Sequence, residues 1–279
     1  MAIFIYQIFY DLPSQYILDN GFIPLNNKNN ERPDWREYWP IKNFLSNNLL
    51  DEDSLYGFFS PKFKEKTSLT SDNVKEFINV NSGHDVFLFC PYFDQAAYFK
   101  SVFEHMFEAH PSSNKIDIIN SLIEKIGYAV NLNELVMDSR HTIFSNFIVA
   151  KPKFWRLWLA LNEKIFNEAE NTLSNFYSYL NTETNYHIDS KVQNKVFIME
   201  RMASLILLLE PTFKVCAYNQ IHMPIAHHAF KDRELELAQL NAFKIAFALT
   251  RHKEYLELFY SYRNMLAKIV HDNNSHIAP

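Results

Sequence analysis

DSLYGFFSPKF, residues 53–63, predicts a buried strand that ends in a turn, and this decides the fold class. Gly57, one of only four glycines in the chain, interrupts an otherwise apolar run and predicts a close backbone approach. Pro61 follows the apolar run after Ser60 and ends the strand, because proline cannot donate to a strand ladder. Lys62 then lies at the carboxyl end of the strand, where open α/β sheets bind their ligands. The stretch therefore predicts the rim of a binding site.

Other segments extend this pattern in both directions along the chain. Further strands are predicted at residues 3–10, 85–90 and 142–149. Residues 19–34 are rich in asparagine and proline and predict turns, with Asp34 as the N-cap of the next helix. Additional helices are predicted at 71–77, 94–110, 116–126, 154–176 and 195–209. Strands that alternate with helices favour an α/β fold over a helical bundle or an all-β fold.

Composition excludes several classes of protein. The 279-residue chain has a net charge of −5, which argues against the basic stripe of a nucleic-acid-binding protein. No run of 18 uncharged apolar residues occurs, so the sequence predicts a soluble protein with no transmembrane segment. Cys90 and Cys216 are too few for a disulfide framework, which favours a reducing compartment and a cytoplasmic location.

Generic catalytic motifs are missing from the sequence. The isolated glycines form neither a P-loop nor a dinucleotide fingerprint. His222 and His227 lie close enough in sequence to share a metal, but their spacing is not that of a regular ligand set, and ordinary loop histidines are the better explanation. Glu200 and Arg201 interrupt an apolar helix, and charged residues in such a place are either paired or part of a site.

Six stretches resemble a group of bacterial GT-A type glycosyltransferases of capsule and lipopolysaccharide biosynthesis clusters. They occur in the order that the family shows and are IYQIFYD, DNGFIPLNNKNNERPDWREYWPIKNFL, YGFFSPKFKEKTSLT, HDVFLFCPYFD, SNFIVAKPKFWRLWLAL and FIMERMASLILLLE. The resemblance implies a GT-A-like, Rossmann-like central mixed sheet flanked by helices over residues 1–228, followed by a helical C-terminal extension over residues 229–279. It implies transfer of a sugar from a nucleotide sugar, a UDP-sugar being the expected donor, to a glycan acceptor.

The resemblance also suggests roles for particular residues. Tyr6 and Gln7 would lie near the base or ribose of the donor, with the asparagine-rich loop 26–32 close by. Lys62 would reach the donor diphosphate, and a solvated lysine after a plain strand is the alternative. Glu200, paired with Arg201, would be the base that deprotonates an acceptor hydroxyl, with a purely structural salt bridge as the alternative.

The chain departs from the family at its metal site. GT-A enzymes commonly bind Mn²⁺ or Mg²⁺ with an Asp-x-Asp pair, whereas here Asp94 stands alone after the strand at 85–90. The acidic run at 51–53 precedes its strand and is expected to be solvated. Two alternatives follow, a weakly bound cation at Asp94 or no cation, with Lys62 or Arg140 offsetting the diphosphate charge.

Residues 232–270 predict two amphipathic helices with a break near Arg251. Their apolar residues cover more than one stripe, which predicts burial on more than one side. A homo-oligomer, another partner subunit, or a peripheral contact at the inner face of the membrane could supply that burial, and packing onto the chain's own core is the alternative. A non-catalytic scaffold that docks another subunit through these helices is therefore the alternative to a glycosyltransferase.

Overall fold

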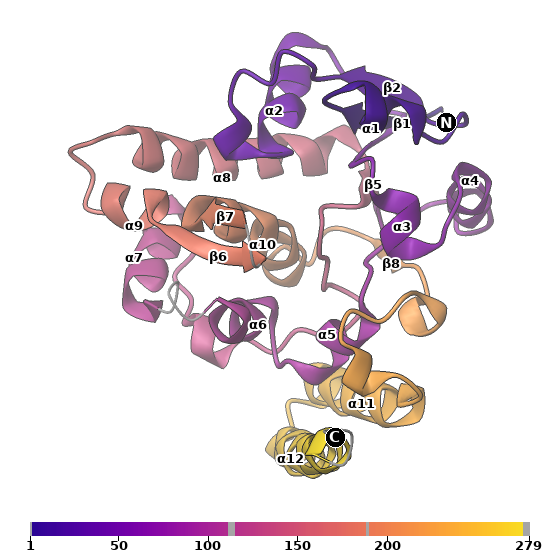
Figure 1. Cartoon of the computed structure of the whole chain (residues 1–279), viewed down its shortest axis with the longest axis vertical. Coiled ribbons are helices and arrows are strands. Elements are labelled where there is room, and N and C mark those ends of the chain that lie inside the picture. The colour runs from indigo at the N-terminus through magenta and orange to yellow at the C-terminus, as the bar shows by residue number, and fades with distance from the viewer. Residues whose placement is uncertain (1, 111–114, 188–189, 276–279) are drawn as a thin grey trace.

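A mixed six-stranded sheet runs through the computed structural model, which describes residues 2–110, 115–187 and 190–275, and helices cover both faces of the sheet (Figure 1). In sheet order the strands are β2 (Ile23–Asn26), β1 (Ile3–Phe9), β3 (Leu55–Phe59), β5 (Ile148–Ala150), β4 (Val86–Leu88) and β8 (Val215–Ala217). Strand β5 is antiparallel to its neighbours β3 and β4, and the other strands run parallel to one another. The predicted α/β class, with a mixed central sheet and a helical C-terminus, is confirmed.

Alternate residues of the strands enter two separate cores, one on each face of the sheet. Tyr56 and Phe58 point to the larger core, whereas Leu55 and Phe59 point to the smaller one. A period of two is the expected pattern for a strand that is buried on both faces. Phe154, Trp155 and Trp158 form an aromatic stripe at helical spacing, and all three side chains are buried in the larger core.

Helices between residues 63 and 80 contribute side chains to the smaller core, and most of the other helices contribute to the larger one. The helices that cover the two faces or follow the strands are α1 (Leu12–Tyr16), α2 (Tyr38–Asn47), α3 (Phe63–Thr67), α4 (Ser71–Val80), α5 (Phe93–Tyr98), α6 (Val102–Ala109), α7 (Ile116–Ile126), α8 (Pro152–Glu170), α9 (Tyr177–Asn181) and α10 (Asn194–Leu209). A hairpin of β6 (Glu183–His187) and β7 (Ser190–Gln193) precedes α10. In the part of the chain that the structure describes, we find no helix with the length and apolar character needed to cross a bilayer.

Gly57 lies where β3 and β5 leave no room for a side chain. It pairs with Val149 of β5, and a Cβ at position 57 would lie 2.8 Å from Cγ2 of Val149. The carbonyl oxygen of Ile148 would be 3.1 Å away. The close backbone approach predicted for Gly57 is thus present, and it is made to the antiparallel strand within the sheet.

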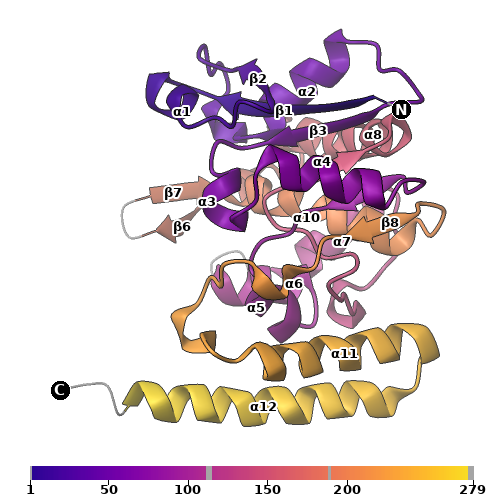
Figure 2. The same cartoon turned by 90° about the vertical axis from the view of Figure 1, so that its right-hand side faces the viewer.

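The C-terminal helices α11 (Glu234–Thr250) and α12 (Lys253–Ser275) form a hairpin that lies below the edge strand β8 in Figure 2. The predicted break occurs at Arg251, which has a left-handed conformation. Leu237 and Leu240 pack with Phe93 of α5 in a third apolar core. Lys244 is buried and its Nζ donates to the carbonyl oxygens of Ala96 (2.5 Å) and Phe99 (2.7 Å), close to the end of α5.

Several predicted boundaries are wrong for local reasons. The helix predicted at 94–110 is divided into α5 and α6, because Ser101 leaves the helical conformation and caps α6 by accepting from the Glu104 amide. The long helix predicted at 154–176 ends at Glu170, and α9 follows after a turn. The strand predicted at 142–149 forms only over Ile148–Ala150, after irregular backbone.

The polar segment at residues 19–34 contains a strand that hydrophobic periodicity does not predict. Strand β2 lies within 19–34, a range predicted to be turns only, and it lies at the edge of the sheet with little of it buried. Asp34 does not cap a helix, because its carboxylate is paired with Arg32 and Lys195. It lies in a 3-10 turn, and α2 begins later, at Tyr38.

Candidate functional site

The carboxyl ends of the parallel strands define the edge of the sheet where a ligand is expected. Strand β1 has β2 on one side and β3 on the other, so the connections after β1 and β3 lead in opposite directions. A crevice at such a switch point is the usual ligand site of open α/β sheets. Here the switch point lies between Tyr10, which follows β1, and Ser60, which follows β3.

Gln7 ties this edge together from within the sheet. Its side chain is buried, and Nε2 donates to the carbonyl oxygen of Ser60 (3.3 Å) while Oε1 accepts from the amide of Asp19 (2.9 Å). Both ends of the amide are therefore bound within the protein. Tyr6 points to the opposite face and packs against Phe44 and Phe58. The structure thus places Tyr6 and Gln7 on different faces of β1.

The end of β3 carries an exposed lysine and leads to a second one that is held in place. Lys62 is exposed immediately before α3. Lys66, one turn later, donates from Nζ to Oγ of Ser145 (2.8 Å). Ser145 precedes β5, so this bond joins the connection after β3 to the neighbouring antiparallel strand.

Glu200 and Arg201 form an ion pair at the same edge, with Nη1 of Arg201 2.7 Å from Oε2 of Glu200. The Arg201 side chain is 3% exposed, whereas that of Glu200 is 29% exposed. Oε1 of Glu200 accepts from the backbone amide of Ser145 (2.9 Å). The carboxylate is therefore fixed by two donors and still open to solvent. We call Lys66, Ser145, Glu200 and Arg201 the edge cluster.

Arg201 is supported by further acceptors around its guanidinium group. Nη1 donates to the carbonyl oxygen of Phe197 (3.0 Å) and Nε to that of Val102 (3.4 Å). Nη2 lies 3.4 Å from Nδ1 of His105. Burial, followed by the nearby Arg201 charge, lowers the pKa of His105 to about 3, so the imidazole is neutral and can accept at Nδ1. The guanidinium is thus fixed, and it fixes Glu200 in turn.

Three of the eight described non-glycine residues with a positive φ lie in the connections at this edge of the sheet. Tyr92 (φ 67°), Ser145 (φ 65°) and Asn146 (φ 53°) have left-handed backbone conformations without being glycine. Such residues cost about 1–3 kcal/mol each and occur preferentially at functional sites. Oδ1 of Asn146 is buried and, within the described residues, has no hydrogen-bond partner. Three strained residues and an unsatisfied acceptor mark this edge as a candidate functional site.

Asp94 lies near this edge but already has partners. Its carboxylate is buried and accepts from the backbone amides of Ala226 and His227, each at 3.0 Å. Burial raises the pKa of Asp94 despite these bonds. Within residues 2–110, 115–187 and 190–275, no three His, Cys, Asp or Glu side chains converge on a common point. Asp94 therefore holds the loop that follows β8, and a cation there would have to share its carboxylate with two amides.

The other predicted residues lie apart from the edge cluster. Arg140 forms a two-pronged pair with the buried carboxylate of Asp138 and lines a cavity between β8 and α11. His227 accepts from the amide of Ala229 and so caps a short turn. In the acidic run at 51–53, Glu52 is exposed and paired with Arg156 at the opposite edge of the sheet.

The asparagine-rich loop forms a small polar pocket beside the end of β2. Its volume is about 190 Å³, and it is lined by Asn26, Asn27, Lys28, Asn29, Glu31, Trp39 and Asn43. The amide of Asn27 donates to the carbonyl oxygen of Phe9, which places the loop next to the end of β1. The pocket therefore adjoins the switch point.

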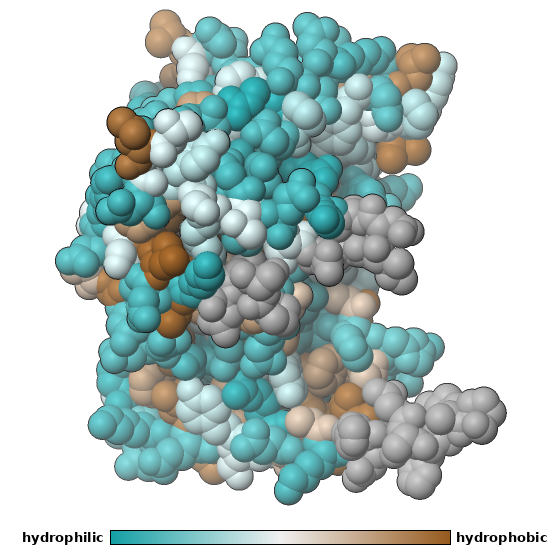
Figure 3. Space-filling model, turned by 60° about the vertical axis from the view of Figure 1, so that its left-hand side comes forward, coloured by the Kyte–Doolittle hydropathy of each residue, from teal (hydrophilic) through white to brown (hydrophobic). Residues whose placement is uncertain are grey.

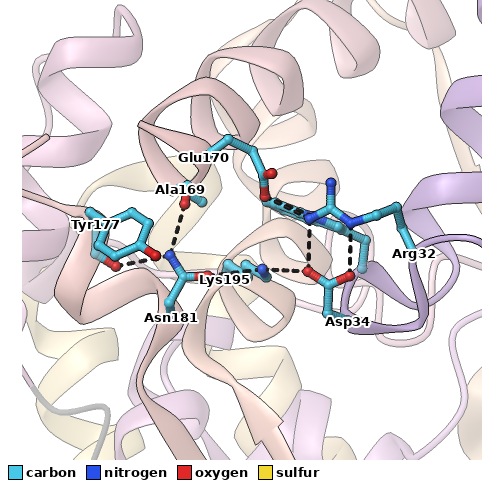
Figure 4. Close-up of polar contacts among 8 residues, drawn as sticks. Arg32, Asp34, Ala169, Glu170, Tyr177, Asn181 and Lys195 are labelled. Carbon is cyan, nitrogen blue, oxygen red and sulfur yellow. Dashed lines mark hydrogen bonds and ion pairs between the residues drawn. The ribbon is translucent and has the colours of Figure 1, made fainter. Parts of the chain in front are cut away.

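A second polar cluster anchors the start of α10, the helix that carries Glu200. The buried Nζ of Lys195 donates to Asp34 (2.8 Å) and Asn181 (2.9 Å), and Arg32 joins Asp34 to Glu170, as Figure 4 shows. We call this set the closed network, because these side chains pair with one another between the loop before α2, the end of α8, and α9.

Sequence reasoning missed Lys66 and Ser145. Lys66 is one of several lysines in KFKEK, and no pattern distinguishes it from its neighbours. Ser145 acquires its role from a left-handed backbone that brings its amide to Glu200. The sequence indicates this only through Asn146, which follows Ser145, because asparagine tolerates a left-handed backbone.

Comparison with known proteins gives no match, whether with family models, curated proteins or solved structures.

Proposed function

We propose that the protein is a glycosyltransferase of the GT-A type that moves a sugar from a nucleotide sugar, a UDP-sugar in our reading, to a glycan acceptor in bacterial surface polysaccharide synthesis. The observation that carries the proposal is Glu200, a partly exposed carboxylate held by Arg201 and by the Ser145 amide at the ligand edge of an α/β sheet. A fixed and accessible carboxylate is what a general base requires. The donor and the setting rest on the sequence resemblance alone.

In this proposal the nucleotide lies at the switch point between the ends of β1 and β3. The polar pocket of the asparagine-rich loop supplies amide donors and acceptors on one side. Lys62 and Lys66, before and within α3, supply positive charge on the other side. A diphosphate leaving group carries negative charge that such lysines stabilise in the transition state.

Glu200 then removes the proton from an acceptor hydroxyl. At the same time the oxygen of that hydroxyl bonds to the anomeric carbon of the donor sugar. The bond from that carbon to the diphosphate breaks, and the electron pair leaves with the nucleoside diphosphate. Arg201 keeps the carboxylate in position, because its guanidinium is fixed by the backbone carbonyls of Phe197 and Val102. Its role is therefore to position Glu200 rather than to contact the substrate.

A divalent cation, Mn²⁺ or Mg²⁺, would neutralise the diphosphate if one binds. Asp94 is the carboxylate that could approach it, but both of its oxygens accept backbone amides. Lys62 and Lys66 therefore neutralise more of the diphosphate charge in this proposal.

Thermal unfolding in the presence of nucleotides tests the proposal. UDP and UDP-sugars should raise the unfolding midpoint, because a ligand that binds only the folded state stabilises it. Incubation with the correct UDP-sugar should release UDP slowly even without an acceptor. If no nucleotide raises the midpoint, with or without Mn²⁺, the proposal is wrong.

A non-catalytic scaffold is the second candidate, and exposed apolar side chains on the C-terminal helices favour it. Leu235 and Leu249 of α11 and Leu258 and Met265 of α12 are exposed. They could contact a second copy of the chain, another subunit or the inner face of a membrane. On the face drawn in Figure 3, however, hydrophobic residues occur in small groups among hydrophilic ones. Nucleotide binding without any release of UDP would favour the scaffold.

A further inference from the structure

The outer edge of the sheet at β8 is open. β8 pairs only with β4 within the described residues. The amide of Val86 donates to Lys214, and the amide of Tyr218 donates to Leu88. In a parallel ladder this register directs the backbone groups of Lys214, Cys216 and Tyr218 toward β4.

Val215 and Ala217 therefore direct their amide and carbonyl groups away from the sheet. Within the part of the chain that the structure describes, these four backbone groups have no hydrogen-bond partner. Exposed strand edges are templates for pairing with another chain, and proteins usually protect them. Here no proline, lysine or bulge lies within β8 to do so.

A cavity of about 550 Å³ lies along this edge, between β8 and α11. Its size is within the range of about 300–1,000 Å³ that ligand sites occupy. Ala238 and Ala242 of α11 line the wall opposite the strand, and their small side chains keep it open. In Figure 2, α11 lies along the edge of the sheet below β8. The cavity is thus a slot with a strand edge on one side and a helix on the other, and we call it the β8 slot.

Two polar features inside the slot point to a ligand. Gln220 is 2% exposed, its Nε2 donates to Ser139, and its buried Oε1 has no partner among the described residues. Arg140 is the one Lys, Arg, Asp or Glu among the residues that line the slot, and Asp138 behind it offsets its charge. Nε and Nη2 of Arg140 bind Asp138, which leaves Nη1 for a further acceptor. A partner with a carboxylate would complement this wall.

We propose that the β8 slot binds an extended peptide that carries an Asp or Glu side chain and adds as a seventh strand. Its backbone pairs with Val215 and Ala217, and alternate side chains pack against the small and apolar walls of the slot. Its carboxylate reaches Nη1 of Arg140. Strand addition of this kind takes affinity from main-chain hydrogen bonds and specificity from alternate side-chain pockets. The inference does not depend on the proposed glycosyltransferase activity.

The test begins with selection of random dodecapeptides on phage against the immobilised full-length chain. A selected peptide is then synthesised with a fluorophore, and its dissociation constant is measured by anisotropy. We expect the selected peptides to share alternating apolar residues and one Asp or Glu. Changing that acid to the amide should weaken binding about tenfold.

Two variants locate the binding site. Ala217→Pro removes one outward amide and keeps the hydrogen bonds to β4, because proline is tolerated where a strand amide faces outward. Ala242→Trp fills the slot from α11. Each should weaken binding at least tenfold. Thr250→Trp adds the same side chain at an exposed position of α11 outside the slot and should change affinity less than twofold.

Unchanged unfolding midpoints of the three variants would show that they remain folded. Should Ala217→Pro unfold, the comparison of Ala242→Trp with Thr250→Trp still decides the result. Selected peptides without acidic residues, or binding that Ala242→Trp leaves intact, would overturn the proposal. Dimerisation of the chain that Ala242→Trp abolishes, with no peptide enriched, would also overturn it in favour of a second copy in the slot.

Discussion

The closed network and the edge cluster both contain charged residues of α10, Lys195 in the first and Glu200 in the second, yet these two side chains differ in their exposure to solvent. Lys195 of the closed network is buried, and its ammonium group has two oxygen partners within the protein. Glu200 of the edge cluster has two donors and remains 29% exposed. The Lys195 charge is buried and paired, and so stabilises the fold. The carboxylates of Asp34 (33% exposed) and Glu170 (38%) are as accessible as that of Glu200, so what distinguishes Glu200 is its place at the ligand edge of the sheet. The position of a polar residue in a helix does not distinguish the two.

The largest effect should come from Glu200→Gln, which keeps the shape of the side chain and removes the base. We expect turnover with donor and acceptor to fall roughly 100-fold or more, with donor binding retained. Steady-state kinetics and nucleotide-induced thermal shifts measure the two effects. Glu170→Gln, in the closed network, is the matched control and should keep its turnover below the unfolding temperature. Equal turnover of Glu200→Gln and the native chain would make Glu200 a structural partner of Arg201.

Lys195→Met should break the closed network without removing any group that takes part in the proposed reaction. The methionine fills a similar volume, but Asp34 and Asn181 each lose a donor. An unsatisfied polar group costs about 1–3 kcal/mol, and that loss should appear in the free energy of unfolding by denaturant titration. Lys42→Met removes a lysine from a more exposed pair with Glu163 and should cost less. If both substitutions cost the same, the closed network has no special role in stability.

The closed network should also weaken in acid. Burial alone would raise the pKa of Asp34, but hydrogen bonds from Arg32 and Lys195 outweigh it and lower the pKa below 3.8. A carboxylate whose pKa is lower in the folded state stabilises the fold above the unfolded pKa, and loses this contribution as pH falls through the folded value. Stability should therefore decline below about pH 4. Asp34→Asn should show a smaller decline than the native chain in titrations followed by circular dichroism.

The smallest effect should come from relieving strain at the edge cluster. Ser145→Gly removes the cost of a left-handed serine, about 1 kcal/mol, and also the hydroxyl that accepts from Lys66. Ser68→Gly relieves the same conformation at an exposed position that ends α3. Both should raise the free energy of unfolding, Ser68→Gly by more, and only Ser145→Gly should lower turnover. If turnover falls in Ser68→Gly and not in Ser145→Gly, the strained backbone at Ser145 has no role in turnover.

The sequence allowed the fold to be predicted where hydrophobic patterns were strong. β1, β3 and β4 and the break at Arg251 lie close to where apolar periodicity placed them. β2 was missed, because an edge strand with little burial carries no such pattern. β5 was predicted too long, because its early residues are buried without being extended.

The candidate site could be predicted only in part. Glu200 and Arg201 were found because charges inside an apolar helix need partners, and the ion pair between them is present. Lys66 and Ser145 were not found, because they meet through a turn and a strained backbone. Arg140 was grouped with the donor-binding residues, and the structure places it in the β8 slot, at the opposite edge of the sheet from β2. Which loop residues come together in space depends on the conformation of the turns, and the composition of the loops does not specify that conformation.

The contacts that complete α5 have a consequence for biosynthesis. Asp94 holds the amides of Ala226 and His227, and the carbonyls of Ala96 and Phe99 receive their donor from Lys244. Chains begin to fold from the N-terminus while the ribosome is still adding residues. Even a nascent chain in which β1, β3, β5 and β4 have paired must therefore wait for Lys244 to emerge before α5 gains these partners. Until then it displays apolar residues of α5 such as Phe93 and Ala97, the kind of surface that a ribosome-associated chaperone recognises.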